Sequence, residues 1–195
     1  MREHMLPVDA NKAYRLFNLG GTALVSAAFD GVEGIMPATW ICPLDLCPTK
    51  ATAVIDKSHF TRPLIEKSGY FALMLPTAAI VNETMKLGTV SKFDEPQKIE
   101  KSGAKLFHME GFGLPLVEGC AAWAIFRVIP DANDEQHFDL FKGECVAAWA
   151  DDRVFSEGHW HLEKAPASMR LLHYVAGGHW YVTGDPLVLP EYNDD

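Results

Sequence analysis

Hydroxyl, cationic and aromatic side chains gather in three short segments of this 195-residue chain. The first, Met36-Pro-Ala-Thr-Trp40, follows an apolar run and a glycine-containing turn. It places a hydroxyl group, backbone N–H groups and an indole close together at the end of a strand. The second, Asp56-Lys-Ser-His-Phe-Thr-Arg62, carries two cations and two hydroxyls between an expected strand and an expected helix. The third, Gly88-Thr-Val-Ser-Lys92, follows a helical pattern. Together they favour a ligand with a flat ring at one end and an anionic group at the other.

The residues that we expect to touch this ligand combine small hydrogen-bonding groups, glycine, an indole and positive charge. Backbone N–H groups at a helix N-terminus are unpaired and lie at the positive end of the helix dipole, so they attract a phosphate, and neighbouring cations add to the attraction. Flavin mononucleotide (FMN) is the leading candidate for the ligand. The candidate binding residues are Met36, Pro37, Ala38, Thr39, Trp40, Lys57, Ser58, Thr61, Arg62, Gly88, Ser91 and Lys92.

Each segment also has an ordinary structural interpretation. Thr39 and Trp40 fit a plain strand, and Ser58 or Thr61 fits a helix cap, which is the commoner role of such residues. Lys92 fits a solvated loop. Taken one segment at a time, the sequence leaves both interpretations open.

Two histidine-containing segments suggest other chemistry. His159-Trp-His161 resembles a metal-binding pair, but residues i and i+2 share a face only in a strand, and no third ligand is spaced to complete a zinc site. A structural or surface role is therefore favoured, and we expect no metal. His137 is expected to open a strand, either as an ordinary edge residue or close to a bound substrate.

The composition restricts the class of protein. With 48% hydrophobic and 22% charged residues, the chain is typical of one globular domain over residues 1–195, with residues 186–195 as a flexible acidic tail. The net charge of −9 argues against nucleic acid or an anionic membrane as partner. No apolar run is long enough for a membrane helix, and the N-terminus lacks a signal-peptide core, so we expect a cytoplasmic protein. The four cysteines are expected to be reduced, buried thiols.

Periodicity predicts a mainly β fold with peripheral helices. Strands are expected at 22–29, 35–41, 51–55, 70–75, 116–129, 137–150 and 179–183, and helices between Asp9 and Gly20, at 58–68, at 78–87 with Gly88 as its stop, and near 166–175. The long apolar runs 120–128 and 144–149 fit central strands of a closed sheet. Strands at this spacing, with Gly and Pro turns, favour a β-barrel.

No Gly-x-Ser-x-Gly, Walker-type or Gly-x-Gly-x-x-Gly motif follows a strand, which leaves hydrolase, nucleotidase and Rossmann-type functions without support. Taken in order, the segments resemble the flavin reductase-like family of FMN-binding split barrels, particularly its flavoredoxin-like branch. The resemblance covers about residues 13–183. Its pieces are 31–40, 57–65 with 69–76, 88–91, 115–128, 137–146 and 171–181.

The resemblance implies a six-stranded Greek-key barrel with added helices, a homodimer, and one non-covalent FMN per subunit near the dimer interface, with FAD as the alternative flavin. By position, it implies that residues 36–40 line the flavin and that Lys57 and Thr61 lie at its ring edge or phosphate. Gly88, Ser91 and Lys92 would complete the site. His137 matches the position on the nicotinamide side, which makes it the candidate catalytic residue, with a positioning role.

The expected function is therefore that of an NAD(P)H-dependent flavin oxidoreductase, which passes electrons through FMN to an acceptor or to a redox partner protein. Two alternatives stay open. One is a flavoredoxin-like electron carrier without direct NAD(P)H activity. The other is a split barrel that has lost flavin and binds haem or another ligand. The sequence does not choose between NADH and NADPH.

Overall fold

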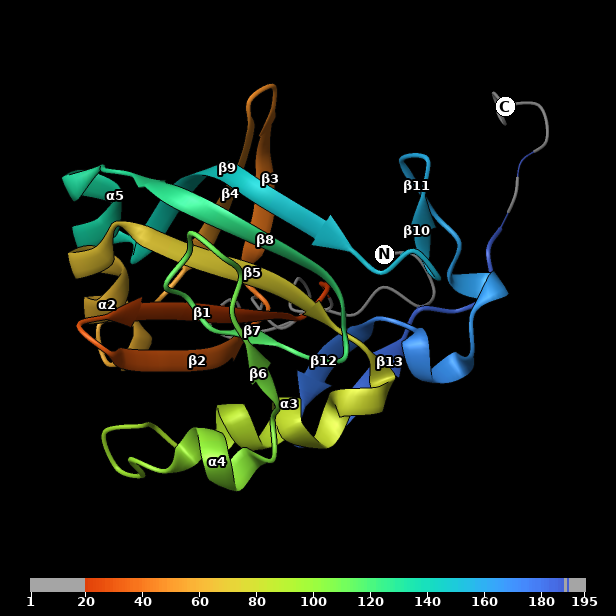
Figure 1. Ribbon diagram of the computed structural model, residues 1–195, viewed down its shortest axis with the longest axis horizontal. Helices are drawn as coiled ribbons and strands as arrows, with labels where there is room; N and C mark the ends of the chain where they lie inside the picture. The colour runs from red at the N-terminus through yellow and green to blue at the C-terminus, as the bar shows by residue number, and fades with distance from the viewer. Residues whose placement is uncertain (1–19, 188, 190–195) are drawn as a thin grey trace, which may run out of the picture.

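The computed structural model describes residues 20–187 and 189, and its main feature is a seven-stranded antiparallel sheet (Figure 1). In spatial order the strands are β2 (Val32–Ala38), β1 (Ala23–Phe29), β5 (Tyr70–Pro76), β8 (Cys120–Ile129), β9 (Leu140–Ala150), β4 (Thr49–Val54) and β3 (Ile41–Leu46). The β3–β4 hairpin projects from one side of the sheet, at the top of the view in Figure 1.

Four helices and three small hairpins surround this sheet within the described residues. The helices are α2 (Thr61–Ser68), α3 (Val81–Thr89), α4 (Lys98–Ser102) and α5 (Ala132–His137), and 3-10 turns lie at Ala78–Ile80, Leu162–Lys164 and Ala167–Met169. The hairpins pair β6 (Leu106–Phe107) with β7 (Leu116–Val117), β10 (Phe155–Ser156) with β11 (His159–Trp160), and β12 (Leu172–Ala176) with β13 (His179–Val182). Figure 1 shows α4 and the β12–β13 hairpin at opposite ends of α3.

The core forms where the sheet packs against itself and against α2. Strand β1 is buried from Ala23 to Ala27 because α2 and neighbouring strands cover both of its faces, which explains its continuous apolar run. Phe71 and Phe126 stack with their ring centroids 5.3 Å apart. Gly143 on β9 leaves room for them, since an added Cβ would lie 2.7 Å from both residues.

The mainly β fold is confirmed, and most expected strands are present within one to three residues of their expected ends. The range 35–41 is instead the end of β2 and the start of β3, with Thr39 and Trp40 between them. The helix expected between Asp9 and Gly20 lies outside the described residues, as does most of the acidic tail. In the described part of the chain, no helix is long and apolar enough to cross a bilayer.

Four local expectations are wrong. Cys42 and Cys47 are exposed on the β3–β4 hairpin, whereas buried thiols were expected. Residues 166–175 do not form a helix, because Leu172–Ala176 pairs with β13 and cross-strand pairing outweighs helix propensity. Gly88 does not stop its helix, which continues to Thr89. His137 does not open a strand but ends α5, because the Asp131 carboxylate caps that helix by accepting from the N–H groups of Asn133 and Asp134.

Candidate functional site

A cavity of about 850 Å³ opens where the end of β2, the N-terminus of α2, the second half of α3, the loop to α4 and the β12–β13 hairpin meet. Ten of the twelve candidate binding residues line it, although they come from three separate segments of the chain. These are Met36, Pro37, Ala38, Thr39, Trp40, Ser58, Thr61, Gly88, Ser91 and Lys92. The three segments singled out from the sequence therefore share one site.

Arg62 does not line the cavity. Its side chain is 4% exposed and donates to Glu66 Oε1 at 2.8 Å, to the Ile55 carbonyl at 2.9 Å, to the Glu135 carbonyl at 2.6 Å and to Asp139 Oδ1. Burial alone would lower the pKa of Arg62, but the bonds to Glu66 and Asp139 outweigh it and raise that pKa. Arg62 therefore ties α2 to the chain that follows α5.

Lys57 and His137 also lie outside the cavity wall. Lys57 Nζ donates to the Gln136 carbonyl at 2.6 Å, which links the loop before α2 to α5. The exposed His137 ring places Nδ1 3.0 Å from the Asn133 carbonyl of its own helix. The next two residues, Phe138 and Asp139, do line the cavity. The structure thus gives both side chains local partners on α5.

Lys98 is a cavity residue that the sequence analysis missed. It is 7% exposed and, among the described residues, its amine forms no hydrogen bond or ion pair. Burial, together with the neighbouring charge of Lys92, lowers the pKa of Lys98 to about 8. In sequence it lies in a polar loop six residues after Lys92 and gives no sign of burial. A buried cation without an acidic partner is costly unless a ligand supplies the negative charge.

Two further buried polar atoms in the cavity wall lack a partner. Thr84 is fully buried on α3, and its Oγ1 makes no hydrogen bond, although a helical threonine usually bonds the carbonyl four residues earlier. His59 Nδ1 is also buried and unpaired. Burial lowers the pKa of His59, which favours the neutral ring. Buried polar atoms are nearly always satisfied, so these two indicate a missing hydrogen-bonding partner.

The N-terminus of α2 faces the same space. His59, Phe60 and Thr61 line the cavity, and no side chain caps the helix there. Ser58 is not that cap, because its hydroxyl donates to Asp56 Oδ1 at 2.6 Å. Uncapped N–H groups and the helix dipole favour an anion at this end.

Lys92 is held at the rim by its own bonds. Its Nζ donates to the Glu33 carbonyl at 2.7 Å and lies 5.6 Å from the centre of the Phe60 ring. The Glu33 carboxylate in turn contacts His108 Nε2 at 2.6 Å. These contacts connect β2 to the loop before α4 and to the loop between β6 and β7, so the positive charge of Lys92 has a fixed place near Lys98.

Gly88 has a packing role in addition to its place in the cavity wall. An added Cβ would lie 2.7 Å from Cγ of Pro37, so α3 can approach the end of β2 only because residue 88 has no side chain. We expect Gly88→Ala to destabilise the fold by about 1–2 kcal/mol, because overpacking against the stiff proline ring exceeds the gain in helix propensity. Urea unfolding measures this change.

The control for this substitution is Gly113→Ala. An added Cβ there meets no described residue within 4 Å, and the Gly113 backbone is not in the left-handed region. We expect its unfolding free energy to stay within about 0.5 kcal/mol of that of the wild type. Equal effects of the two substitutions would contradict the packing role of Gly88.

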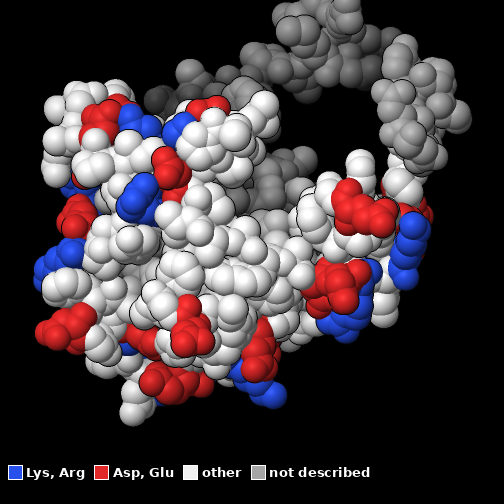
Figure 2. Space-filling view, turned by 45° about the horizontal axis from the view of Figure 1, so that its top comes forward, with Lys and Arg blue, Asp and Glu red and all other residues white. Residues whose placement is uncertain are grey.

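No cluster of three or more His, Cys, Asp or Glu residues suited to a metal occurs in the part of the chain that the structure describes. His159 and His161 belong to the small β10–β11 region, away from the cavity wall. Asp and Glu are interspersed with Lys and Arg on the face in Figure 2, which shows no broad field of positive charge. The cavity is therefore the strongest candidate for the functional site.

The family model described as "Flavin reductase like domain" matches residues 18–178. The chain belongs to this family. A solved flavin reductase-like structure, the FMN-binding domain of an enzyme from Shewanella baltica, is 45% identical with a TM-score of 0.85, covering 93% of this chain and 95% of that one. YddH of Escherichia coli K12 is 36% identical over 182 residues, covering 92% of this chain and 95% of its own.

More distant flavin reductase-like structures share the fold. Flavoredoxin from Methanosarcina acetivorans has a TM-score of 0.75 at 21% identity, and the match covers 97% of each chain. A split-barrel protein from Shewanella frigidimarina described as a putative flavin reductase has a TM-score of 0.74 at 15% identity. The family resemblance seen in the ordered motifs is confirmed, and so is the split-barrel fold class.

Proposed function

We propose that this flavin reductase-like protein binds FMN in the cavity and works as an NAD(P)H-dependent oxidoreductase. The observation that carries the proposal is the set of buried, unpaired polar groups in the cavity wall: Lys98, Thr84 Oγ1 and His59 Nδ1. A cation, a hydroxyl and a neutral imidazole beside an uncapped helix N-terminus fit a ligand that is anionic and accepts hydrogen bonds. The 45% identical protein from Shewanella baltica is described as FMN-binding, which supports FMN as that ligand.

The flavin, when bound, supplies the chemistry of accepting a hydride and passing on one or two electrons. The chain's own residues bind and orient it. Lys98 and Lys92 provide positive charge, Thr84 and His59 provide hydrogen bonds, and the apolar wall of Ile35 and Leu87 excludes water. Because no bond of the protein is made or broken, no side chain has to act as an acid or a base. We therefore propose no acid–base role for His137.

The proposal is tested with the protein as purified. Its visible spectrum and extracted cofactor should show FMN, and anaerobic addition of NADH or NADPH should bleach the flavin absorbance. Bleaching only by a reduced partner protein would replace the reductase proposal with the electron-carrier alternative. A colourless protein that does not take up added FMN would refute the flavin site altogether.

We further propose that two copies of the chain form a dimer through the face that carries the β3–β4 hairpin. A second hollow of about 800 Å³ lies beside this hairpin, and its apolar lining includes Trp123, Trp149 and Trp160. The hairpin itself exposes Leu44 by 50% and Leu46 by 92%. An apolar arm next to an apolar hollow on one molecule is self-complementary, and such exposed apolar surface is typical of an interface.

The molar mass in solution tests the dimer. We expect about twice the 21.6 kDa of one chain, and Leu46→Glu should shift the protein toward monomer by placing a charge in the interface. Val32→Glu is the matched control, because Val32 is 42% exposed on β2, at the other edge of the sheet. A monomeric wild type at micromolar concentration would refute the interface.

A further inference from the structure

The cavity has two chemically different ends. The charged end lies at the start of α4 and in the loop before it, where Lys98, Lys92 and Asp94 line the cavity. The other end is lined by the β12–β13 hairpin, which Figure 1 shows on the side of α3 away from α4. The charged cavity residues come from the neighbourhood of α2, α4 and α5, and the hairpin contributes only Tyr174 and Trp180. Charged side chains therefore recognise one end of a ligand, and uncharged aromatic side chains of the hairpin recognise the other end.

The hairpin end is an aromatic wall, which we define as Trp40, Tyr174 and Trp180. Tyr174 and Trp180 are direct cross-strand partners, and their ring centroids are 4.7 Å apart at an angle of 54°. Both are half-buried, and Trp40 reaches the cavity from the link between β2 and β3. Paired aromatic faces at a cavity rim favour a flat ring, because stacking adds to the burial of apolar area.

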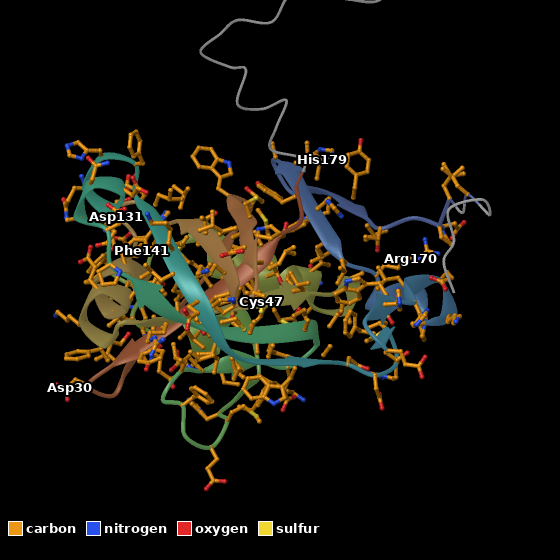
Figure 3. All side chains as sticks on the ribbon, turned by 90° about the horizontal axis from the view of Figure 1, so that it is seen from above. Asp30, Cys47, Asp131, Phe141, Arg170 and His179 are labelled. Atoms are coloured by element: carbon orange, nitrogen blue, oxygen red, sulfur yellow. The ribbon has the colours of Figure 1, made fainter. Side chains whose placement is uncertain are left out.

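The aromatic wall also carries hydrogen-bond donors. Within the described residues, neither the Tyr174 hydroxyl nor the Trp180 indole N–H forms a hydrogen bond. The two histidines of the hairpin, His173 and His179, do not line the cavity, and Figure 3 marks His179 near the hairpin tip. The hairpin thus lines the cavity with two aromatic side chains that carry neutral donors, and with no charged side chain. An uncharged ring bearing carbonyl oxygens matches both features.

The hairpin is fixed to the main sheet at its base. The Thr22 N–H donates to the Leu172 carbonyl at 2.9 Å, and the Tyr174 N–H donates to Thr22 Oγ1 at 3.1 Å. Thr77 and Leu171 form a bridge beside it. Toward the tip, Gly177 and Gly178 form the turn, and among the described residues nothing lies within 4 Å of an added Cβ on either. The wall is thus anchored to the main sheet where Tyr174 lies.

We propose that the aromatic wall binds a quinone as the electron acceptor of this site, an inference that rests on the proposed FMN-dependent function. The net reaction would convert NAD(P)H, a proton from solvent and the quinone into NAD(P)⁺ and the hydroquinone, and a bound FMN would supply the redox chemistry. The nicotinamide is oxidised to NAD(P)⁺ and the quinone is reduced to the hydroquinone, so two electrons and two protons are accounted for. The charged end holds the flavin, and the hairpin end selects the neutral acceptor.

The test is direct binding of 1,4-naphthoquinone to the oxidised, FMN-loaded protein by equilibrium dialysis, without any electron donor. Trp180→Leu should raise the dissociation constant of the quinone by about 5- to 30-fold through loss of the stacking face. The dissociation constant of FMN should change less than twofold. Tyr181→Leu is the matched control, since Tyr181 is the next residue, is 63% exposed and does not line the cavity. It should leave both constants unchanged.

The dialysis results distinguish failure of the proposed quinone site from failure of the proposed FMN-dependent function. Unchanged quinone binding in Trp180→Leu would overturn it, and so would an equal loss of FMN affinity, which would show that the wall packs on the flavin. Selective loss of quinone binding would support it. Because dialysis needs no NAD(P)H, a protein whose flavin is not bleached by NAD(P)H, yet which binds quinone through Trp180, would refute only the reductase proposal.

Discussion

Replacing Lys98 by methionine should weaken FMN binding while it stabilises the flavin-free protein. A charge-assisted hydrogen bond contributes about 1.5–3 kcal/mol, so the dissociation constant should rise by about 10- to 150-fold. In the free protein, however, Lys98 is a buried cation without an acidic partner, and methionine of similar length removes that cost. Each kcal/mol gained in the free energy of unfolding raises the melting temperature by roughly 2–4 °C in a chain of this size.

Lys101→Met provides the control for this result. Lys101 lies one helical turn further on the same short helix, but its side chain is 60% exposed and pairs with Glu95. We expect FMN affinity to be unchanged and stability to move by less than about 0.5 kcal/mol. A Lys98→Met protein with normal FMN affinity would remove Lys98 from the site.

Comparing FMN with riboflavin shows which part of the ligand Lys98 faces. If Lys98 binds the phosphate, Lys98→Met should weaken FMN binding and leave riboflavin binding unchanged. If it faces the ring, affinity for both should fall, and the midpoint potential of the bound flavin should become more negative, because a nearby cation favours the anionic reduced ring. Calorimetry and a potentiometric titration distinguish these two results.

The same lysine should make FMN affinity depend on pH. An anionic ligand prefers the protonated amine, and the pKa of Lys98 in the free protein is lowered to about 8. Affinity should therefore be constant between about pH 7 and 8, above the titration of the phosphate, and should fall as the pH rises from 8 toward 10. The phosphate does not titrate in this range, since its second pKa is near 6. The Lys98→Met protein should lack this decline, and a flat wild-type profile would contradict the assignment.

Arg62→Met should be among the most destabilising single changes in the described part of the chain. It removes the guanidinium from four acceptors and leaves the Asp139 carboxylate and the Ile55 and Glu135 carbonyls without their donor. Breaking a buried ion pair by removing one partner costs about 3–5 kcal/mol. Urea unfolding of the flavin-free protein measures this loss apart from any effect on ligand binding.

Arg127→Met is the matched control for Arg62. Arg127 also pairs with a glutamate, Glu144 at 3.0 Å, but its side chain is 58% exposed. Its loss should cost less than about 1 kcal/mol. If instead Arg62→Met kept full stability and lost FMN affinity, Arg62 would be a phosphate ligand, as its place in the sequence suggested, and the structural role assigned to it would be wrong.

Much of the fold could be predicted because local patterns and tertiary structure agree. The apolar runs around Phe71, Phe126 and Phe141 form central strands. Asp131 caps α5, and Figure 3 shows it at the same end of the molecule as Phe141. The secondary structure was predicted wrongly where cross-strand pairing or helix capping determines it. The segment at Leu172 is compatible with a helix, but its partner strand lies beyond a two-glycine turn.

The site was predictable by segment and less so by residue. Thr39, Ser91 and Lys92 were found because turns and helix ends gather hydroxyls and cations. Lys98 was not predicted because nothing in the polar sequence around it indicates that this lysine is buried. Arg62 was assigned to the ligand because a cation near a helix N-terminus suits an anion, and the sequence could not reveal its partner Asp139, 77 positions away.

The cavity wall is formed by residues as far apart in the sequence as Thr22 and Trp180, so its parts leave the ribosome at different times. During synthesis the cationic end can fold once α4 has emerged, whereas the aromatic wall is added only after β12 and β13. A nascent chain that ends before Leu172 can therefore already bind the flavin, but it lacks the aromatic wall proposed for the acceptor. Flavin is then bound early and quinone late, so quinone retention by FMN-loaded, ribosome-bound chains of increasing length should rise steeply once the hairpin has emerged.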